Sequence, residues 1–223
     1  MVFLFEDNAG KNSFSIKGES FKYLIKVRRH SVGDELSFRS SDDVKTLHRY
    51  KIVSIDNRSL DVELIASELK EVKANKNLHI GWCMIDTKSI EKVLPSLCEM
   101  GVDKISFISC ERSQKNFKPD FKRFERILHA SMQQSGRSSF IKFDSFKNIK
   151  EFVKEFPNVK IFDFCDKTLD DYSDIDTVLI GCEGGFSEDE REFLEGCDVF
   201  SLPTPMVLRS ESAVVAVASK VLL

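Results

Sequence analysis

Hydrophobic and polar residues alternate over much of the first 70 positions. The stretches 36–38, 50–55 and 60–64 keep a period of two, with polar turns between them. Short alternating strands of this kind are typical of small barrels. Residues 1–70 therefore predict a small β-barrel domain.

A helical spacing of apolar residues interrupts this alternation. Phe21, Leu24, Ile25 and Val27 would share one side of a short helix. The basic residues beside them include Lys26, Arg28 and Arg29. Such a basic rim either contacts nucleic-acid phosphates or is simply solvated, and the pattern alone does not choose between the two.

After a charged stretch at residues 68–76, which we interpret as a linker, strands and helices alternate. Strands are expected at residues 78–85, 102–108, 159–164, 178–181 and 199–202. Helices are expected at residues 89–100, 121–134, 146–156 and 213–223. Pro95 should kink the first helix or delay its start. The repeated strand–helix units predict an α/β domain over residues 71–223, with a mainly parallel sheet whose ligands lie at the carboxyl ends of the strands.

Composition changes this picture little. With 42% hydrophobic and 31% charged residues, the chain is typical of soluble globular proteins. No apolar run reaches the ~20 residues that span a bilayer, and the N-terminus lacks a signal-peptide pattern. The six cysteines and four histidines are scattered, so we expect reduced thiols, a cytoplasmic protein and no metal site.

The net charge of −3 hides an uneven distribution. Residues 76–150 carry 14 Lys and Arg against 8 Asp and Glu, whereas residues 151–223 carry 6 against 16. A basic middle suggests a surface for a polyanion, with two solvated faces of different charge as the alternative. Within it, Arg112, Lys115 and Arg137 are candidates for phosphate contacts.

A glycine-rich loop follows the strand expected at residues 178–181. Gly181, Gly184 and Gly185 allow a ligand to approach the backbone closely, although many strand–helix turns hold glycines for tightness alone. Residues 187–190 read Ser-x-x-Glu, a capping box that starts the next helix. The loop lacks the Gly-Lys-Ser/Thr of a P-loop and has acidic neighbours, so it suits a ligand with a positive centre, such as a sulfonium.

A second loop, at residues 203–212, precedes the last helix. Its two prolines stiffen it, and residues 206–208 are apolar. Arg209 and Glu211 bring charge to a helix start at which Ser210 is a suitable N-cap. These residues indicate either the chemical end of a ligand site or a helix cap with a surface ion pair.

The two loops resemble those of the RsmE family of SPOUT methyltransferases, which methylate uracil N3 in small-subunit ribosomal RNA. Family members show Leu-Ile-Gly-Pro-Glu-Gly-Gly-Phe-Ser, and residues 179–187 show this string with Cys182 in place of Pro. The family's Leu-Gly-x-Arg-Ile-Leu-Arg-Thr-Glu-Thr-Ala resembles residues 203–213, where Thr204 replaces Gly and Met206 replaces Arg. Weaker similarities, in the same order as in the family, lie at residues 27–29, 33–34, 90–102, 111–112 and 134–137.

The resemblance implies a PUA-like barrel that binds RNA and a SPOUT domain with a deep trefoil knot. It also implies S-adenosylmethionine as cofactor, small-subunit ribosomal RNA as partner, and a homodimer with its site at the subunit interface. By resemblance, the cofactor-binding residues would be Leu179, Ile180, Gly181, Glu183, Gly184, Gly185, Leu202, Pro203, Met206, Val207, Leu208, Ser210 and Ala213. The RNA-binding residues would be Lys26, Arg28, Arg29, Arg112, Lys115 and Arg137.

The expected catalytic residues are Arg209 and Glu211. Uracil N3 must lose a proton as it attacks, so Arg209 would stabilise the developing anion, and Glu211 would orient Arg209 or relay the proton. The target base would have to be exposed or flipped. Two alternatives stay open: a SPOUT enzyme that methylates a ribose 2′-hydroxyl, and a noncatalytic RNA-binding protein with a degenerate cofactor loop.

Overall fold

The computed structural model describes residues 2–113, 118–169, 172 and 174–223. The chain divides into two compact units. Unit 1 comprises Met1–Lys73 and Met132–Ser139, and unit 2 comprises Ala74–Ser131 and Phe140–Leu223. The segment Met132–Ser139 thus joins unit 1, although the boundary predicted at residue 70 would assign it to the second domain.

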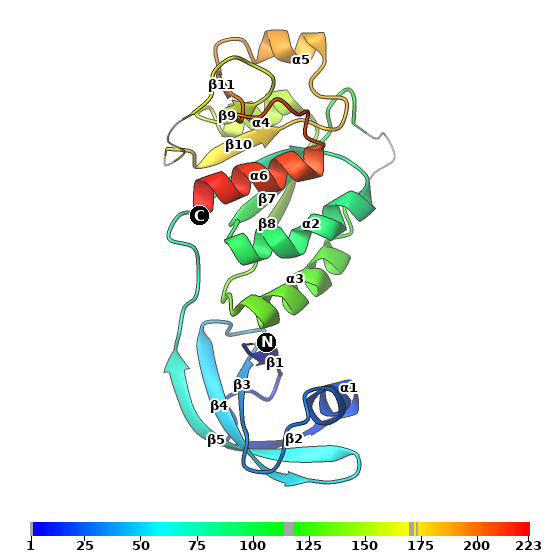
Figure 1. The fold of residues 1–223 in the computed structure, drawn as a ribbon, viewed down its shortest axis with the longest axis vertical. Helices are drawn as coiled ribbons and strands as arrows, with labels where there is room; N and C mark the ends of the chain where they lie inside the picture. The colour runs from blue at the N-terminus through cyan, green and yellow to red at the C-terminus, as the bar shows by residue number, and fades with distance from the viewer. Residues whose placement is uncertain (1, 114–117, 170–171, 173) are drawn as a thin grey trace. The chain divides into compact units, whose positions relative to one another are not determined.

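Unit 1 is built on a five-stranded sheet, as its alternating pattern predicts (Figure 1). Its strands are β1 (Leu4–Phe5), β2 (Ser13–Lys17), β3 (Glu35–Arg39), β4 (Thr46–Ile55) and β5 (Ser59–Leu69), in the order β1-β3-β4-β5-β2. The pairs are antiparallel except β1 with β3. Strand β2 was not predicted, although Phe14 and Ile16 alternate with polar residues in it.

The basic helix of unit 1 is α1 (Gly18–Lys22), which continues as the π-helical turn η1 (Tyr23–Val27). Phe21 and Leu24 are buried in the core of the sheet, as expected. Val27 is not part of this apolar face, because it is 66% exposed to solvent. A π-turn holds more residues per turn than an α-helix, so the predicted spacing does not carry through to its end.

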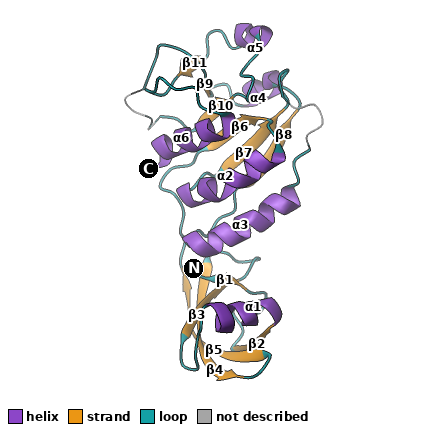
Figure 2. Cartoon of the chain, turned by 45° about the vertical axis from the view of Figure 1, so that its right-hand side comes forward, coloured by secondary structure: helices purple, strands orange, loops and turns teal. Residues whose placement is uncertain are grey.

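Unit 2 is an α/β unit around a six-stranded sheet in which every neighbouring pair is parallel (Figures 1 and 2). Its strands are β6 (His79–Cys83), β7 (Lys104–Ile108), β8 (Lys142–Phe146), β9 (Lys160–Phe162), β10 (Thr177–Ile180) and β11 (Asp198–Phe200), in the order β11-β9-β10-β6-β7-β8. Its helices are α2 (Thr87–Met100), α3 (Phe121–Ser135), which ends in unit 1, α4 (Ile149–Glu155), α5 (Glu188–Phe193) and α6 (Ser210–Leu222). The predicted parallel sheet with covering helices is confirmed.

Local signals decide where two of these helices begin. Helix α2 starts at Thr87, because the Asp86 carboxylate accepts a hydrogen bond from the Ser89 backbone N–H. Pro95 was expected to kink this helix or to delay its start, and the start at Thr87 excludes the delay. Helix α4 starts after Asn148, whereas Phe146, predicted as its first residue, ends the unpredicted strand β8.

Two of the six thiols expected to be reduced form a disulfide, between Cys83 and Cys110. Strands β6 and β7 are parallel neighbours, with Cys83 paired to Ile108 in register. The cysteines therefore meet at the carboxyl ends of the two strands, although 27 residues separate them in sequence. This proximity could not be foreseen from their spacing.

Within the described residues, no helix is long and apolar enough to cross a membrane.

Candidate functional site

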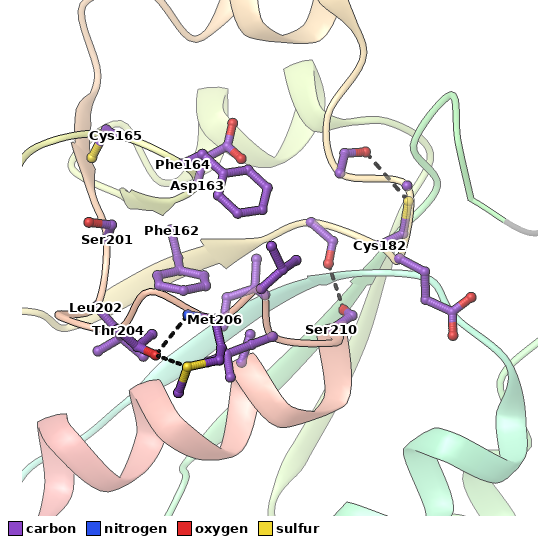
Figure 3. Close-up of a pocket in the computed structure, with 18 of the residues that line it drawn as sticks. Phe162, Asp163, Phe164, Cys165, Cys182, Ser201, Leu202, Thr204, Met206 and Ser210 are labelled. Carbon is purple, nitrogen blue, oxygen red and sulfur yellow. Dashed lines mark hydrogen bonds between the residues drawn. The ribbon is translucent and has the colours of Figure 1, made fainter.

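A pocket of about 710 Å³ opens where strands β9, β10 and β11 end (Figure 3). Three loops line it: residues 163–166 after β9, residues 181–185 after β10, and residues 201–208 after β11. The carboxyl ends of parallel strands are the usual place for a ligand in such a sheet. The two loops singled out from sequence therefore share one cavity.

Most of the predicted cofactor-binding residues line this pocket. They are Ile180, Gly181, Glu183, Gly184, Gly185, Leu202, Met206, Val207, Leu208, Ser210 and Ala213. The other two do not line it: Leu179 is buried within β10, and Pro203 is exposed. The loop after β9 was missed, although it follows an expected strand at the same sheet edge.

The glycine loop has a compact turn. The Gly185 N–H donates to the Cys182 carbonyl (2.9 Å), and Gly185 has a positive φ of 66°, which favours glycine. A side chain on Gly184 would lie 3.3 Å from the Cβ of Arg112, tighter than ordinary van der Waals contact. Glycine therefore suits the left-handed backbone at position 185, and at position 184 it leaves room for the Arg112 side chain.

The capping box predicted after this loop is present. The Ser187 hydroxyl accepts from the Glu190 N–H (3.1 Å), and the Glu190 carboxylate accepts from the Ser187 N–H (2.9 Å). The second oxygen of Glu190 accepts from the Glu111 N–H (2.9 Å), and Arg112 donates to the Gly184 carbonyl (2.9 Å). The loop after β7 therefore supports the glycine loop from outside the pocket.

The loop after β11 is fastened at both ends. Near its start, the Ser201 N–H donates to the Lys167 carbonyl (2.8 Å). At its end, the Ser210 hydroxyl donates to the Gly181 carbonyl (2.6 Å) and accepts from the Trp82 indole N–H (2.8 Å). Arg209, not Ser210, is the N-cap of α6, because the Ser210 hydroxyl is already engaged across the sheet.

Carboxylates give the pocket an acidic lining. Asp163, Asp166 and Glu183 all line it. Arg191 pairs with Asp163 through two hydrogen bonds of 2.8 and 3.2 Å, and this contact raises the pKa of the guanidinium. Asp166 and Glu183 form no ion pair within the described residues, so the pocket suits a ligand that carries positive charge.

The expected catalytic residues, Arg209 and Glu211, are not among the residues that line the pocket. Arg209 is exposed between Leu208 and Ser210, both of which line the pocket. Glu211 is half-buried, and its Oε2 atom is buried without a hydrogen-bond partner in the structure. Arg209 and Glu211 form no ion pair with each other in the described residues, so the exposed guanidinium of Arg209 is open to another molecule, whereas the Oε2 atom of Glu211 is shielded from solvent.

Residues 72–222 match the RNA methyltransferase domain family. The chain belongs to this family. It is 37% identical to the ribosomal RNA small subunit methyltransferase E of Helicobacter pylori strain 26695, over 98% of each chain. Membership confirms the resemblance to the RsmE methyltransferases.

Solved structures share the fold of this methyltransferase. A methyltransferase from Legionella pneumophila, solved with bound SAM, has a TM-score of 0.74 at 21% identity, over 97% of this chain and 95% of that one. A ribosomal RNA small subunit methyltransferase E from Neisseria gonorrhoeae, bound to S-adenosyl methionine, has a TM-score of 0.75 at 16% identity, over 98% and 95%.

The methyltransferase holds its predicted RNA-binding residues in different settings. Lys26, Arg28 and Arg29 are exposed in unit 1 and form no ion pair with described residues. Arg112 is exposed but donates to Gly184, and Lys115 lies outside the described residues. Arg137 is only 5% exposed and donates to the Ser139 hydroxyl (3.1 Å), because its segment folds back into unit 1, so little of it is available to RNA.

Among the described residues, no group of His, Cys, Asp and Glu is arranged to hold a metal ion.

Proposed function

We propose that this methyltransferase transfers a methyl group from S-adenosylmethionine to N3 of a specific uridine in 16S ribosomal RNA of the small subunit. The observation that carries the proposal is the shared pocket. Its glycine loop and its β11–α6 loop line one cavity, and Arg209 lies in the sequence between two pocket-lining residues, Leu208 and Ser210.

The pocket fits S-adenosylmethionine in size and charge. Its volume of about 710 Å³ lies within the ~300–1,000 Å³ of small-molecule sites. Backbone groups around Gly181 and residues 202–208 would hold the adenine and the methionine portion. Asp166 and Glu183 would favour the ammonium and sulfonium charges, which a triphosphate could not offer. When bound, S-adenosylmethionine supplies a methyl group already activated by its sulfonium.

The chain's own task is to prepare the uracil. N3 carries a proton that must leave before or as the nitrogen attacks, so negative charge develops on the imide. The exposed guanidinium of Arg209 would stabilise that charge by hydrogen bonding. The unpartnered Oε2 of Glu211 is an acceptor that can orient Arg209 or take the proton.

Finer features of the proposal rest on the family resemblance and on the fold. The chain passes from the edge strand β11 to α6, whose first residue is tied to Gly181 and Trp82 near the middle of the sheet, and this course supports a trefoil-knotted SPOUT domain. The strand-rich unit 1 with its exposed cations Lys26, Arg28 and Arg29 supports a PUA-like RNA-binding domain.

We propose that the enzyme acts as a homodimer. Exposed apolar side chains of Phe164, Met206 and Val207 line the pocket. Large apolar groups gathered at one place often mark a protein–protein interface. A partner subunit that covered them would complete the wall of the pocket.

Replacement of Arg209 tests the chemical role. Arg209→Ala should lower methyl transfer to undermethylated small subunits by about 100-fold or more, the usual effect of removing one donor to a developing anion. Calorimetry should find the dissociation constant for S-adenosylmethionine nearly unchanged, because the pocket itself stays intact.

Lys220→Ala serves as the control, since it removes an exposed cation from the other end of α6. It should transfer methyl groups as the wild type does. Unchanged turnover by Arg209→Ala would refute the role of Arg209. Mass spectrometry of the digested RNA decides between 3-methyluridine and a 2′-O-methylated nucleoside.

A further inference from the structure

A chain of two hydrogen bonds connects three elements beside the pocket. The indole N–H of Trp82, on β6, donates to the Ser210 hydroxyl at the start of α6 (2.8 Å). That hydroxyl donates in turn to the carbonyl of Gly181, the first residue of the glycine loop (2.6 Å; Figure 3). Ser210 and Gly181 both line the pocket, whereas Trp82 lies behind it in the core.

The hydroxyl of Ser210 is fully committed as a donor. A serine hydroxyl has one hydrogen to donate and two lone pairs to accept with. The hydrogen points to Gly181, and one lone pair takes the indole hydrogen. Ser210 therefore cannot donate a hydrogen bond to a bound molecule without releasing the glycine loop.

The position of Trp82 is fixed by packing. Its side chain is fully buried, and its ring stacks on Phe107 of β7 with centroids 6.2 Å apart. In the sheet, Trp82 pairs in register with Ile180, the residue directly before Gly181. The sheet therefore fixes the position of the indole N–H. Because Ser210 is hydrogen-bonded to both the indole and the Gly181 carbonyl, it fixes the position of the glycine loop relative to the sheet.

We propose that Ser210 is a positioning residue for the cofactor, with Trp82 as its anchor. Through its hydroxyl, the start of α6 and the glycine loop are held at the separation that lets both loops contact one ligand. This inference rests on the proposed function, since it takes S-adenosylmethionine as the ligand of the pocket.

Removal of the Ser210 hydroxyl would affect both of its hydrogen-bond partners, the Trp82 indole and the Gly181 carbonyl. Ser210→Ala leaves a buried N–H and the Gly181 carbonyl without their partner, so the glycine loop moves to find another. Ser210→Thr keeps the hydroxyl and should keep the connection. Ser212→Ala is a matched control, because Ser212 lies in the same helical turn but is exposed, and its side chain makes no hydrogen bond with the residues that the structure describes.

The test measures S-adenosylmethionine affinity by calorimetry and the emission of the chain's single tryptophan. We expect Ser210→Ala to weaken affinity about tenfold, which corresponds to about 1.4 kcal/mol, and to shift the Trp82 emission in the absence of cofactor. Its KM for S-adenosylmethionine should rise while its KM for RNA stays the same. Ser210→Thr and Ser212→Ala should behave as the wild type.

Equal affinity in wild type and Ser210→Ala, with unchanged emission, would overturn the inference alone. A wild-type protein that bound no S-adenosylmethionine would overturn the proposed function as well. If Ser210→Ala does not fold, Trp82→Phe tests the inference instead. It removes the indole N–H that donates to Ser210 and leaves the Ser210 hydroxyl in place. Weakened cofactor affinity in that variant supports the inference, and unchanged affinity overturns it.

Discussion

His79 shows how one buried residue can make the fold sensitive to pH. It begins β6, and its Nε2 atom shares a hydrogen bond with the Ser106 hydroxyl (2.8 Å). Two phenylalanine rings, of Phe152 and Phe156, pack edge-on against the imidazole. Burial, with a smaller contribution from Lys104, lowers the pKa of His79 to about 4. The imidazole is therefore neutral in the folded protein at neutral pH.

This depressed pKa predicts a loss of stability in mild acid. Between the unfolded pKa of about 6.5 and the folded value of about 4, the unfolded chain binds a proton that the folded chain does not. The contribution of His79 to the free energy of unfolding is fully present above pH 6.5. It should fall by about 2.5 kcal/mol by pH 4.5.

Urea denaturation of wild type and His79→Gln at pH 7.5 and 4.5 measures this effect. The variant lacks the titrating group, so its stability should fall less. Burial lowers the pKa values of His48 and His129 too, but both remain in the variant and cancel in the comparison. Equal losses in the two proteins would contradict the assignment.

At the residue scale, the sequence predicts what is encoded locally. Ser187 and Glu190 stand three positions apart, so their capping box is readable from the chain. The partners of Ser210 and Arg191 are not, because Trp82 lies 128 positions from Ser210 and Asp163 lies 28 from Arg191. Only the folded sheet brings these residues together.

At the scale of elements, the Cys83–Cys110 disulfide joins the ends of two parallel strands. The residues that follow Cys110 include Glu111 and Arg112, whose contacts with Glu190 and Gly184 support the glycine loop. The disulfide therefore fixes the base of a loop that in turn holds one wall of the pocket.

Reduction should cost stability because it releases a constraint on the unfolded chain. For a loop of 27 residues, the chain-entropy relation gives about 3.5 kcal/mol. Denaturant titrations with and without reductant measure the change, and the double variant Cys83→Ala/Cys110→Ala should not respond to reductant. Alkylation of the unreduced, unfolded protein should label four of the six cysteines. Six labelled cysteines would contradict the disulfide.

One element that the sequence did not predict has little pattern to read. Strand β8 (Lys142–Phe146) has no fully buried residue, so it lacks the apolar run that marked its neighbours. Its last residue was therefore assigned to the following helix. The predicted start of α2 at residue 89 was two residues late, because the Asp86 cap starts the helix at Thr87. Long alternating strands and capped helices were predictable because their signals are periodic or local.

At the scale of the whole molecule, the class of fold was predictable from the order of the patterns along the chain. Alternating strands followed by strand–helix units indicated a β-rich part and an α/β part, and both are present. The return of Met132–Ser139 to unit 1 depends on contacts such as that of the Val2 N–H with the Gln133 carbonyl (2.8 Å). Such a contact between distant residues cannot be predicted from the spacing of hydrophobic residues along the chain.

The reaction proposed for this enzyme is methyl transfer to N3 of a uridine in 16S ribosomal RNA. Its most direct test is nucleoside mass spectrometry of 16S ribosomal RNA from cells that lack the protein. 3-Methyluridine should disappear there, return with the wild-type chain and not return with Arg209→Ala. Undiminished 3-methyluridine in cells without the protein would contradict this proposal.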